Sequence, residues 1–337
     1  MALVKPISGV DDRVPLAEAL PLSSPFTLNV FPTNACNFRC SYCAQGLGAK
    51  KLADTYGVDK SYMSMETLTK IVKQSKAFSS HYKLLSFMGH GEPLLNKDLP
   101  EMINMVTCAG IAKRIEIITN ASLLTNEISD QLIKSGLTNL RVSLQGLNKD
   151  AYHRTSGVIL DFECFVDRLS YFHRNKKPDM GLFVKIMDVS LGDGDEERFY
   201  GMFDSISDRM FVERVQQVYH AVKLDGESNS NSLIHNRYGY AQPPRKVCPL
   251  AFFSLAVWPN GDVYPCDAIY KPCKLGNVTE KPLIDMWQGD ELRQFRMQLL
   301  HGKKDILSGC QHCCAPNDVS HPADVLDGCE EQIMVLL

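Results

Sequence analysis

The chain has 337 residues, of which 45% are hydrophobic and 22% charged, a globular composition that excludes disordered, collagen-like and coiled-coil classes. Its 36 basic and 39 acidic residues give a formal net charge of −3, which carries no electrostatic sign of a nucleic-acid partner. No apolar run approaches the ~20 residues that span a bilayer, and the first residues contain no secretory apolar segment. We therefore expect a cytoplasmic protein with neither nucleic-acid nor membrane partners.

Short β-rich runs alternate with amphipathic helical patterns between residues 26 and about 215. The six expected strands are Thr27–Phe31, Leu84–Met88, Arg114–Thr119, Asn139–Leu144, Leu182–Met187 and Met210–Val215. The expected helices include Met65–Ala77, Asn126–Ser135, Phe162–Arg174 and Glu196–Ser205, with Ser64 and Thr125 as N-caps and Gly136 after a helix end. This alternation predicts an α/β fold with βαβ units and a parallel sheet, and six units form a partial (β/α)6 TIM-like barrel.

Polar residues within the expected strands predict a polar barrel lumen. In Asn139–Leu144 the period of two places the apolar residues on one face, under the helices, and Arg141 and Ser143 on the other. Lys185 and Glu213 are isolated charges within apolar strands. Each either reaches solvent at a strand end or lines a pocket for a hydroxylated or charged ligand.

The chain changes character after residue 216. A polar run, Asn229–Ser232, and the sequence Pro243-Pro244-Arg245-Lys246 make 217–247 a linker or a covering loop. Phe252–Trp258 and Gly261–Pro265 then predict a β-hairpin, and Leu283–Leu300 predicts a helix. The expected organisation is an N-terminal extension (1–25), a barrel (26–216), the linker (217–247) and a small hairpin-plus-helix domain (248–337).

Twelve cysteines are the one abnormal count, and in a reducing compartment they indicate metal ligands or reactive thiols. Cys36, Cys40 and Cys43 lie on the loop after the first strand. Three thiolates can hold a [4Fe–4S] cluster and leave one iron free, whereas structural zinc needs a fourth ligand. Cys108 and Cys164, which fall in helical patterns, are expected to be small buried thiols.

A second group of cysteines lies in the last quarter of the chain. Cys248 and Cys266 flank the expected hairpin, and Cys310 and Cys313 form a CxxC motif after the helix. Four thiolates brought together in this way fit an iron–sulfur cluster or a zinc ribbon-like site. Three more thiols in the region are not needed for four ligands: Cys273, Cys314 and Cys329.

The Cys-x3-Cys-x2-Cys spacing after strand one, with Tyr42 before the third cysteine, resembles the radical S-adenosylmethionine (SAM) superfamily. The sequence Gly89-His90-Gly91-Glu92-Pro93 after the second strand matches the family's glycine-rich turn. The resemblance covers roughly residues 26–216. It implies a [4Fe–4S] cluster on Cys36, Cys40 and Cys43 and a bound SAM. The implied SAM contacts are Tyr42, Gly89, Gly91, Glu92, Pro93, Asn120 and Ser143.

The C-terminal cysteines resemble the auxiliary-cluster domain of this superfamily, called SPASM in its long form and twitch in its short form. Val319 stands where the long form has a further cysteine, so the resemblance implies the twitch form. It implies a second [4Fe–4S] cluster on Cys248, Cys266, Cys310 and Cys313, for which Cys314 or Cys329 could substitute as a ligand.

In this superfamily a 5′-deoxyadenosyl radical takes a hydrogen atom from unactivated carbon. The interval from Cys248 to Cys266 and the single CxxC are similar to the 2-deoxy-scyllo-inosamine dehydrogenase type. With Arg141, Lys185 and Glu213 as polar lumen residues, we expect dehydrogenation of a carbohydrate, cyclitol or similar polyol. The auxiliary cluster would accept the electron, and a flavodoxin or ferredoxin would supply the electrons that start the reaction.

Alternatives stay open at this point. A thiol of Cys273, Cys314 or Cys329 could return a hydrogen atom and make the reaction an epimerisation. Peptide modification is a second alternative, and a non-catalytic iron–sulfur or zinc protein is a remote one. The molybdopterin-precursor cyclase is disfavoured because its auxiliary-site spacing differs.

Overall fold

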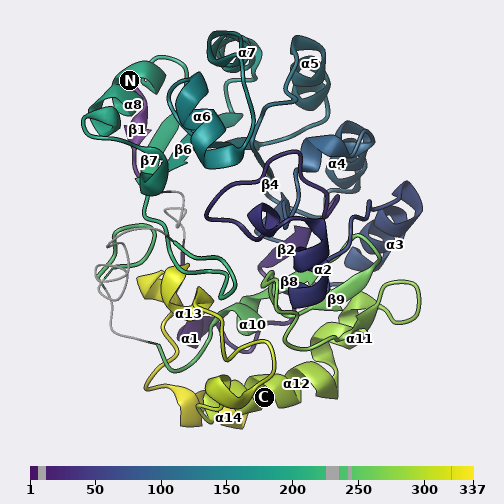
Figure 1. Cartoon of the computed structure of the whole chain (residues 1–337). Coiled ribbons are helices and arrows are strands. Elements are labelled where there is room, and N and C mark those ends of the chain that lie inside the picture. The colour runs from purple at the N-terminus through teal and green to yellow at the C-terminus, as the bar shows by residue number, and fades with distance from the viewer. Residues whose placement is uncertain (7–12, 225–234, 242–244, 320) are drawn as a thin grey trace.

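The computed structural model describes residues 1–6, 13–224, 235–241, 245–319 and 321–337, and its centre is one curved ten-stranded sheet (Figure 1). The strand order is β1-β7-β6-β5-β4-β3-β2-β8-β9-β10. Neighbouring strands from β1 to β8 are parallel, and β9 and β10 are added antiparallel. The strands are β1 (Leu3–Val4), β2 (Thr27–Val30), β3 (Leu84–Phe87), β4 (Ile115–Thr119), β5 (Asn139–Leu144), β6 (Gly181–Met187), β7 (Arg209–Glu213), β8 (Ser254–Val257), β9 (Asp262–Tyr264) and β10 (Gly276–Asn277).

Helices between the barrel strands line the outer side of the sheet, and the C-terminal helices gather near the end of the sheet that holds β8 and β9 (Figure 1). The α-helices are α1 (Leu16–Ala19), α2 (Ala49–Tyr56), α3 (Met65–Ser75), α4 (Leu99–Ala109), α5 (Asn126–Lys134), α6 (Lys149–Ser156), α7 (Phe162–Asn175), α8 (Asp195–Phe203), α10 (Leu250–Phe253), α11 (Leu283–Gln288), α12 (Asp290–Leu300), α13 (Ala315–Asp318) and α14 (Glu330–Leu336). Short 3-10 helices are η1 (Ala44–Leu47), η2 (Pro93–Leu95), η3 (Asp188–Ser190), η4 (Lys304–Ile306) and η5 (Pro322–Asp324).

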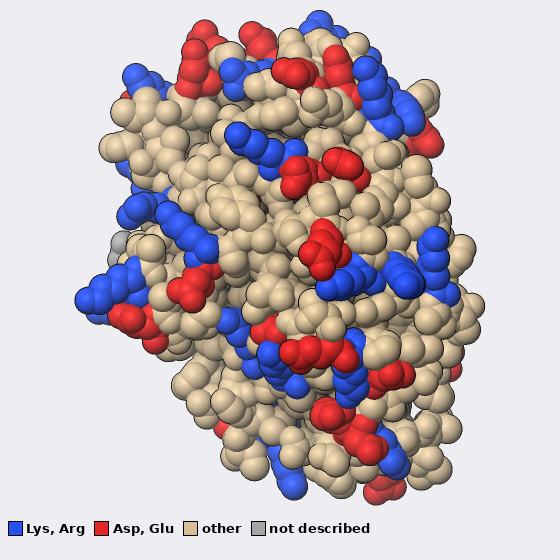
Figure 2. All heavy atoms as spheres, turned by 90° about the vertical axis from the view of Figure 1, so that its right-hand side faces the viewer, with Lys and Arg blue, Asp and Glu red and all other residues tan. Residues whose placement is uncertain are grey.

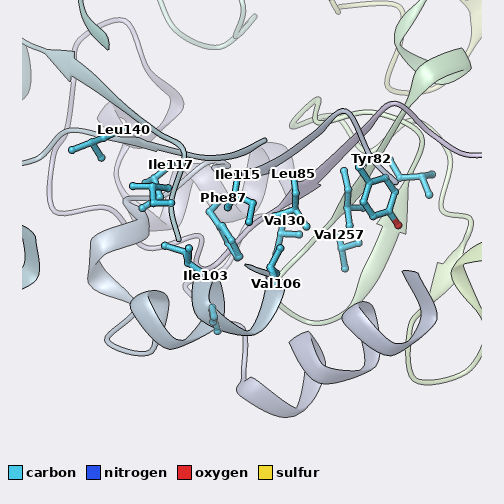
Figure 3. Packing of buried hydrophobic residues seen from close by; sticks show 14 of the residues in the cluster. Val30, Tyr82, Leu85, Phe87, Ile103, Val106, Ile115, Ile117, Leu140 and Val257 are labelled. Carbon is cyan, nitrogen blue, oxygen red and sulfur yellow. The ribbon is translucent and has the colours of Figure 1, made fainter. Parts of the chain in front are cut away.

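The main core lies between the sheet and this outer layer of helices. Figure 3 shows aliphatic and aromatic residues of β2, β3, β4, β5 and β8 side by side, with Ile103 and Val106 of α4 packed against them. The labelled Val30, Leu85 and Ile117 are fully buried. Burying apolar side chains from both layers removes a large apolar area from water, which is the main force that holds helices on the sheet.

The barrel matches the sequence expectation. The six expected strands correspond to β2–β7, and the apolar residues of β5 are buried as the period of two predicts. Ser64 Oγ accepts from Thr67 N at 3.1 Å, and Thr125 Oγ1 accepts from Ile128 N at 3.1 Å, so both expected N-caps are present. β1 was not among the expected strands; it pairs with β7 and adds a strand to that edge.

The C-terminal region differs from the expectation in two places. The hairpin forms, but β8 also pairs in parallel with β2, so it extends the barrel sheet. Phe252 and Phe253 belong to the short helix α10 and not to the strand. The expected helix Leu283–Leu300 is two helices, because extended backbone at Gly289 ends α11 and begins α12.

The expected linker 217–247 is described only in part, and its Asn229–Ser232 and Pro243-Pro244 sequences lie outside the described residues. Among the described helices, none is both long and apolar enough to cross a bilayer. On the face shown in Figure 2, basic and acidic side chains alternate over a largely uncharged surface. That face carries no extended field of one sign.

Candidate active site

The loop that follows β2 carries Cys36, Cys40 and Cys43. Its backbone is fixed on the end of α6, because Arg39 N donates to Ser156 O at 2.9 Å and Ser41 N donates to Thr155 O at 2.8 Å. Burial raises the pKa of the Cys36 thiol to about 12 and that of Cys40 well above its usual range. Such thiols become thiolates only when a metal centre compensates the charge, so the loop is suited to hold one.

The glycine-rich turn after β3 lies directly against this loop. A Cβ on Gly91 would stand 2.4 Å from Ala35 O and 2.5 Å from Thr33 O, so no larger residue fits there. Gly89 has φ +134°, and a Cβ on it would stand 2.6 Å from the Phe31 ring. Gly91 therefore allows the turn and the cysteine loop to touch through their backbones, and Gly89 leaves space for the Phe31 ring.

Glu92 joins three of the loops at this end of the sheet. Its backbone N donates to Ala35 O at 2.8 Å, which ties it to the cysteine loop. Its buried carboxylate accepts from Leu94 N at 3.0 Å, from Thr119 Oγ1 at 2.5 Å and from Asn120 N at 2.7 Å. Burial raises the pKa of Glu92, and these hydrogen bonds oppose the rise. The carboxylate therefore positions the site, in addition to any charge it presents to a ligand.

The other expected SAM contacts lie on neighbouring loops and strands. Asn120 follows β4 and its Nδ2 donates to Asn37 Oδ1 at 3.0 Å, which places it beside the cysteine loop. Tyr42 donates from its hydroxyl to Gln145 Oε1 at 2.5 Å, just beyond the end of β5. Ser143 lies on the lumen face of β5, and Pro93 begins η2 directly after Glu92.

The charged strand residues form one buried network. Arg141 Nη2 lies 2.9 Å from Glu213 Oε1, and Lys185 Nζ lies 2.5 Å from Glu213 Oε2. Glu213 is fully buried, so the alternative that it reaches solvent at a strand end is wrong. Burial opposes its ionisation, but the charges of Lys185 and Arg141 prevail and lower its pKa to about 2. Burial lowers the pKa of Lys185 to about 8.

Two further residues of this site come from the segment 217–247 and were missed by the sequence analysis. Arg237 Nε donates to Asp318 Oδ1 at 2.8 Å, and its Nη1 lies 4.0 Å from Glu213 Oε2. Tyr219 forms a side-chain hydrogen bond with the thiol of Cys43. Nothing in the composition of that segment marks these two residues, because their partners are distant in the sequence.

The four C-terminal cysteines expected as ligands line one small cavity. Cys248, Cys266, Cys310 and Cys313 share its wall with apolar residues of α10 and α12 and with Lys304. Burial raises the pKa of all four thiols, that of Cys310 to about 12, while the charge of Lys304 lowers those of Cys248, Cys310 and Cys313. A largely apolar cavity with four thiols and one cation fits an anionic thiolate-bound cluster.

The spare cysteines lie in different surroundings. Burial raises the pKa of the Cys314 thiol, and the charges of Asp318 and Arg237 act on it in opposite directions, whereas Cys273 is near enough to affect the pKa of Cys310. Cys329 precedes α14 and packs against the main core. Cys108 is exposed and Cys164 only half-buried, so the expectation of two buried thiols was wrong. Both helices bury other residues of their apolar faces instead.

His90 connects the two cysteine sites. Its ring lies 5.4 Å from that of Phe31 and 5.3 Å from that of Trp258, measured between centroids. His90 Nε2 lies 3.0 Å from Asp267 O, the residue after Cys266. Burial lowers the pKa of His90 to about 4, so the ring is neutral and donates this hydrogen bond. The glycine-rich turn is thereby fixed to the second cysteine site.

In the described ranges, no three His, Cys, Asp or Glu side chains are spaced to hold a single metal ion. The donors present are thiols, three on the first loop and four around the cavity, and thiolates suit iron–sulfur clusters. The arrangement is that of an iron–sulfur enzyme with two cluster sites.

The radical SAM superfamily matches residues 30–200, and the chain belongs to that superfamily. An iron–sulfur cluster-binding domain, SPASM, matches residues 248–314.

The protein therefore uses SAM with a radical-SAM [4Fe–4S] cluster, and it carries an auxiliary iron–sulfur cluster.

The sequence relatives of the chain include GTP 3′,8-cyclases. That of Stenotrophomonas maltophilia is 34% identical over 128 residues, which is 37% of this chain and 35% of that protein. That of Haemophilus influenzae is 24% identical over 222 residues, 63% of this chain and 61% of that protein. The chain thus matches between about a third and three fifths of these relatives' lengths.

Solved structures share the fold at low sequence identity. BtrN in complex with AdoMet and 2-DOIA has a TM-score of 0.56 and 19% identity, covering 88% of this chain and 95% of that one. Streptococcus suis SuiB bound to its precursor peptide SuiA has a TM-score of 0.63 and 19% identity, covering 91% and 77%. anSMEcpe with bound AdoMet has a TM-score of 0.61 and 15% identity, covering 92% and 96%.

The first prediction concerns the two cluster sites. Anaerobic reconstitution should give about eight irons per chain, from two four-iron clusters. Alanine at Cys36, Cys40 and Cys43 together should leave about four irons and abolish SAM cleavage to 5′-deoxyadenosine. Cys108→Ala, which changes an exposed thiol, is the control and should keep both. Stoichiometric zinc at the four C-terminal cysteines after reconstitution would contradict the auxiliary-cluster assignment.

The second prediction concerns Glu92. Glu92→Ala removes the acceptor of three hydrogen bonds, so SAM binding should weaken about tenfold to a hundredfold, equivalent to roughly 1.5–3 kcal/mol. Equilibrium binding of SAM to the anaerobic holoenzyme measures this, with iron content expected to stay constant. Glu101→Ala, an exposed change on α4, is the matched control. Unchanged SAM affinity in Glu92→Ala would show that the turn does not position SAM.

Proposed function

We propose that this enzyme dehydrogenates a carbohydrate, cyclitol or similar polyol. The observation that supports it most is the buried ion network of Arg141, Lys185, Glu213 and Arg237 on the lumen side of the strands. Hydroxyl groups both donate and accept hydrogen bonds, and this network offers buried donors and an acceptor in fixed positions. Arg141 Nε is buried and has no hydrogen-bond partner among the described residues, which leaves a donor for a substrate oxygen.

The network has neighbours in both cysteine regions of the chain. Tyr219 contacts Cys43 at one end, and Asp318, held by Arg237, lies on α13 just after Cys313 and Cys314 at the other. A substrate held by the network would therefore lie between both clusters. Holding the reacting groups at fixed separation is the main contribution that a protein makes to such chemistry.

When bound, SAM and the first cluster would supply a 5′-deoxyadenosyl radical able to take a hydrogen atom from the carbinol carbon, and the auxiliary cluster would supply an acceptor for the electron released when the hydroxyl proton leaves. The product is a ketone with two hydrogens fewer than the substrate. On this proposal Cys36, Cys40 and Cys43 hold the first cluster, and Cys248, Cys266, Cys310 and Cys313 hold a four-iron auxiliary cluster. The residues that bind SAM on this proposal are Tyr42, Gly89, Gly91, Glu92, Pro93, Asn120 and Ser143. A flavodoxin or ferredoxin supplies the first electron.

Two alternatives have specific support. Cys314 directly precedes α13, which carries Asp318 of the ion network, and a hydrogen atom returned from its thiol would make the reaction an epimerisation. The likeness to SuiB with its precursor peptide keeps radical modification of a peptide as the second alternative.

Turnover in deuterated water separates dehydrogenation from epimerisation. A thiol exchanges its proton with solvent, so a returned hydrogen atom would carry deuterium into the product. We expect a product two mass units lighter than the substrate, without solvent deuterium at the reacting carbon. An isomer with one deuterium, lost in Cys314→Ala, Cys273→Ala or Cys329→Ala, would contradict dehydrogenation.

A further inference from the structure

A second cavity, of about 840 Å³ and open to solvent, lies at the opposite end of the strands from the cysteine sites. Its walls come from the amino ends of neighbouring strands: Phe26 and Thr27 before and in β2, Lys83 and Leu84 at β3, and Arg114 before β4. The cysteine loop and the glycine-rich turn follow the carboxyl ends of β2 and β3. The strands therefore separate the two sites, which lie at their opposite ends.

The charges around this cavity are strongly unbalanced. Four cationic side chains line it, namely Arg13, Lys83, Lys113 and Arg114, against one carboxylate, Asp324. Asp324 is already paired with Arg13. Among the described residues, no ion pair involves Lys83, Lys113 or Arg114 within 4.0 Å.

The strand register brings these cations together. Tyr82 pairs with Ala112 in a parallel bridge, so Lys83 and Lys113 occupy equivalent positions on two neighbouring segments just before β3 and β4. Like charges on neighbouring strand positions repel each other. Arg114 Nε is also buried and has no hydrogen-bond partner among the described residues. An oxyanion in the cavity would remove both penalties, because it would accept from Arg114 and screen the two lysines.

We propose that this cavity binds a phosphate-bearing anion of the pyrophosphate class. Arg114 supplies a planar donor group, and Lys83 and Lys113 supply compact charges, a combination that suits phosphoryl oxygens. Apolar residues also line the cavity, among them Phe253 and Phe26, whose ring lies 4.1 Å from Lys83 Nζ, and they could contact an organic group attached to the anion. The proposal does not depend on which substrate occupies the barrel lumen.

Calorimetric titration of the anaerobic holoenzyme with inorganic pyrophosphate tests this site, with ADP as a second titrant. We expect saturable binding that weakens roughly tenfold or more in Arg114→Gln and in Lys83→Gln, and that weakens as salt is added. Arg174→Gln, an exposed change at the end of α7, is the control and should leave binding unchanged. Tighter binding of ADP than of pyrophosphate would indicate that the apolar residues of the cavity contact the organic part of the ligand.

SAM cleavage provides the check on folding. All three variants should cleave SAM like the parent enzyme, because the cavity lies away from the cysteine sites. No saturable binding of either titrant, or equal binding by Arg114→Gln and Arg174→Gln, would overturn the proposal. If Arg114→Gln loses both pyrophosphate binding and SAM cleavage, the Lys83→Gln variant decides. Normal pyrophosphate binding by Lys83→Gln, with its SAM cleavage intact, would then overturn the proposal.

Discussion

One buried carboxylate holds the catalytic end of this barrel together. Glu92 reaches the loops after β2, β3 and β4 at once, through a backbone bond to Ala35 O and side-chain bonds to Leu94, Thr119 and Asn120. A buried carboxylate is costly unless donors surround it, so the three loops are held in the one arrangement that supplies those donors. The cysteine loop and the glycine-rich turn inherit their relative position from this contact.

A second buried carboxylate organises the lumen. Glu213 lies at the end of β7 and pairs with Arg141 of β5 and Lys185 of β6, while Arg237 approaches from the loop that follows β7. Breaking a buried ion pair leaves an uncompensated charge, so these side chains are held rigidly. The barrel thus presents fixed polar groups to a substrate, and Asp318 extends the arrangement to the helix beside the auxiliary site.

Much of the fold could be predicted from the sequence because its signals are local. Strand–helix alternation, the N-caps Ser64 and Thr125 and the inward face of β5 all depend on residues near one another in the chain. The break at Gly289 and the pairing of β8 with β2 could not be predicted in this way. Both depend on how distant segments pack, and nothing in Phe252–Trp258 indicates that its strand would extend the barrel sheet.

The site shows the same division. The cysteine motifs and the Gly89–Pro93 turn were identified from short spacings, and Arg141, Lys185 and Glu213 from isolated charges in apolar strands. Tyr219 and Arg237 were not identified, because their roles come from contacts with Cys43 and with Asp318, 81 residues away. His90 was given no specific partner, since its contact with Asp267 O spans 177 residues.

On the proposed function, the lumen places a carbinol carbon within reach of the SAM-derived radical. Turnover of candidate polyols deuterated at each carbinol carbon, followed by mass spectrometry of the 5′-deoxyadenosine formed, tests this. We expect one labelled polyol to transfer a single deuterium to 5′-deoxyadenosine while it becomes a ketone. Deuterium transfer from the Cα or side chain of a peptide, with none from any polyol, would contradict it.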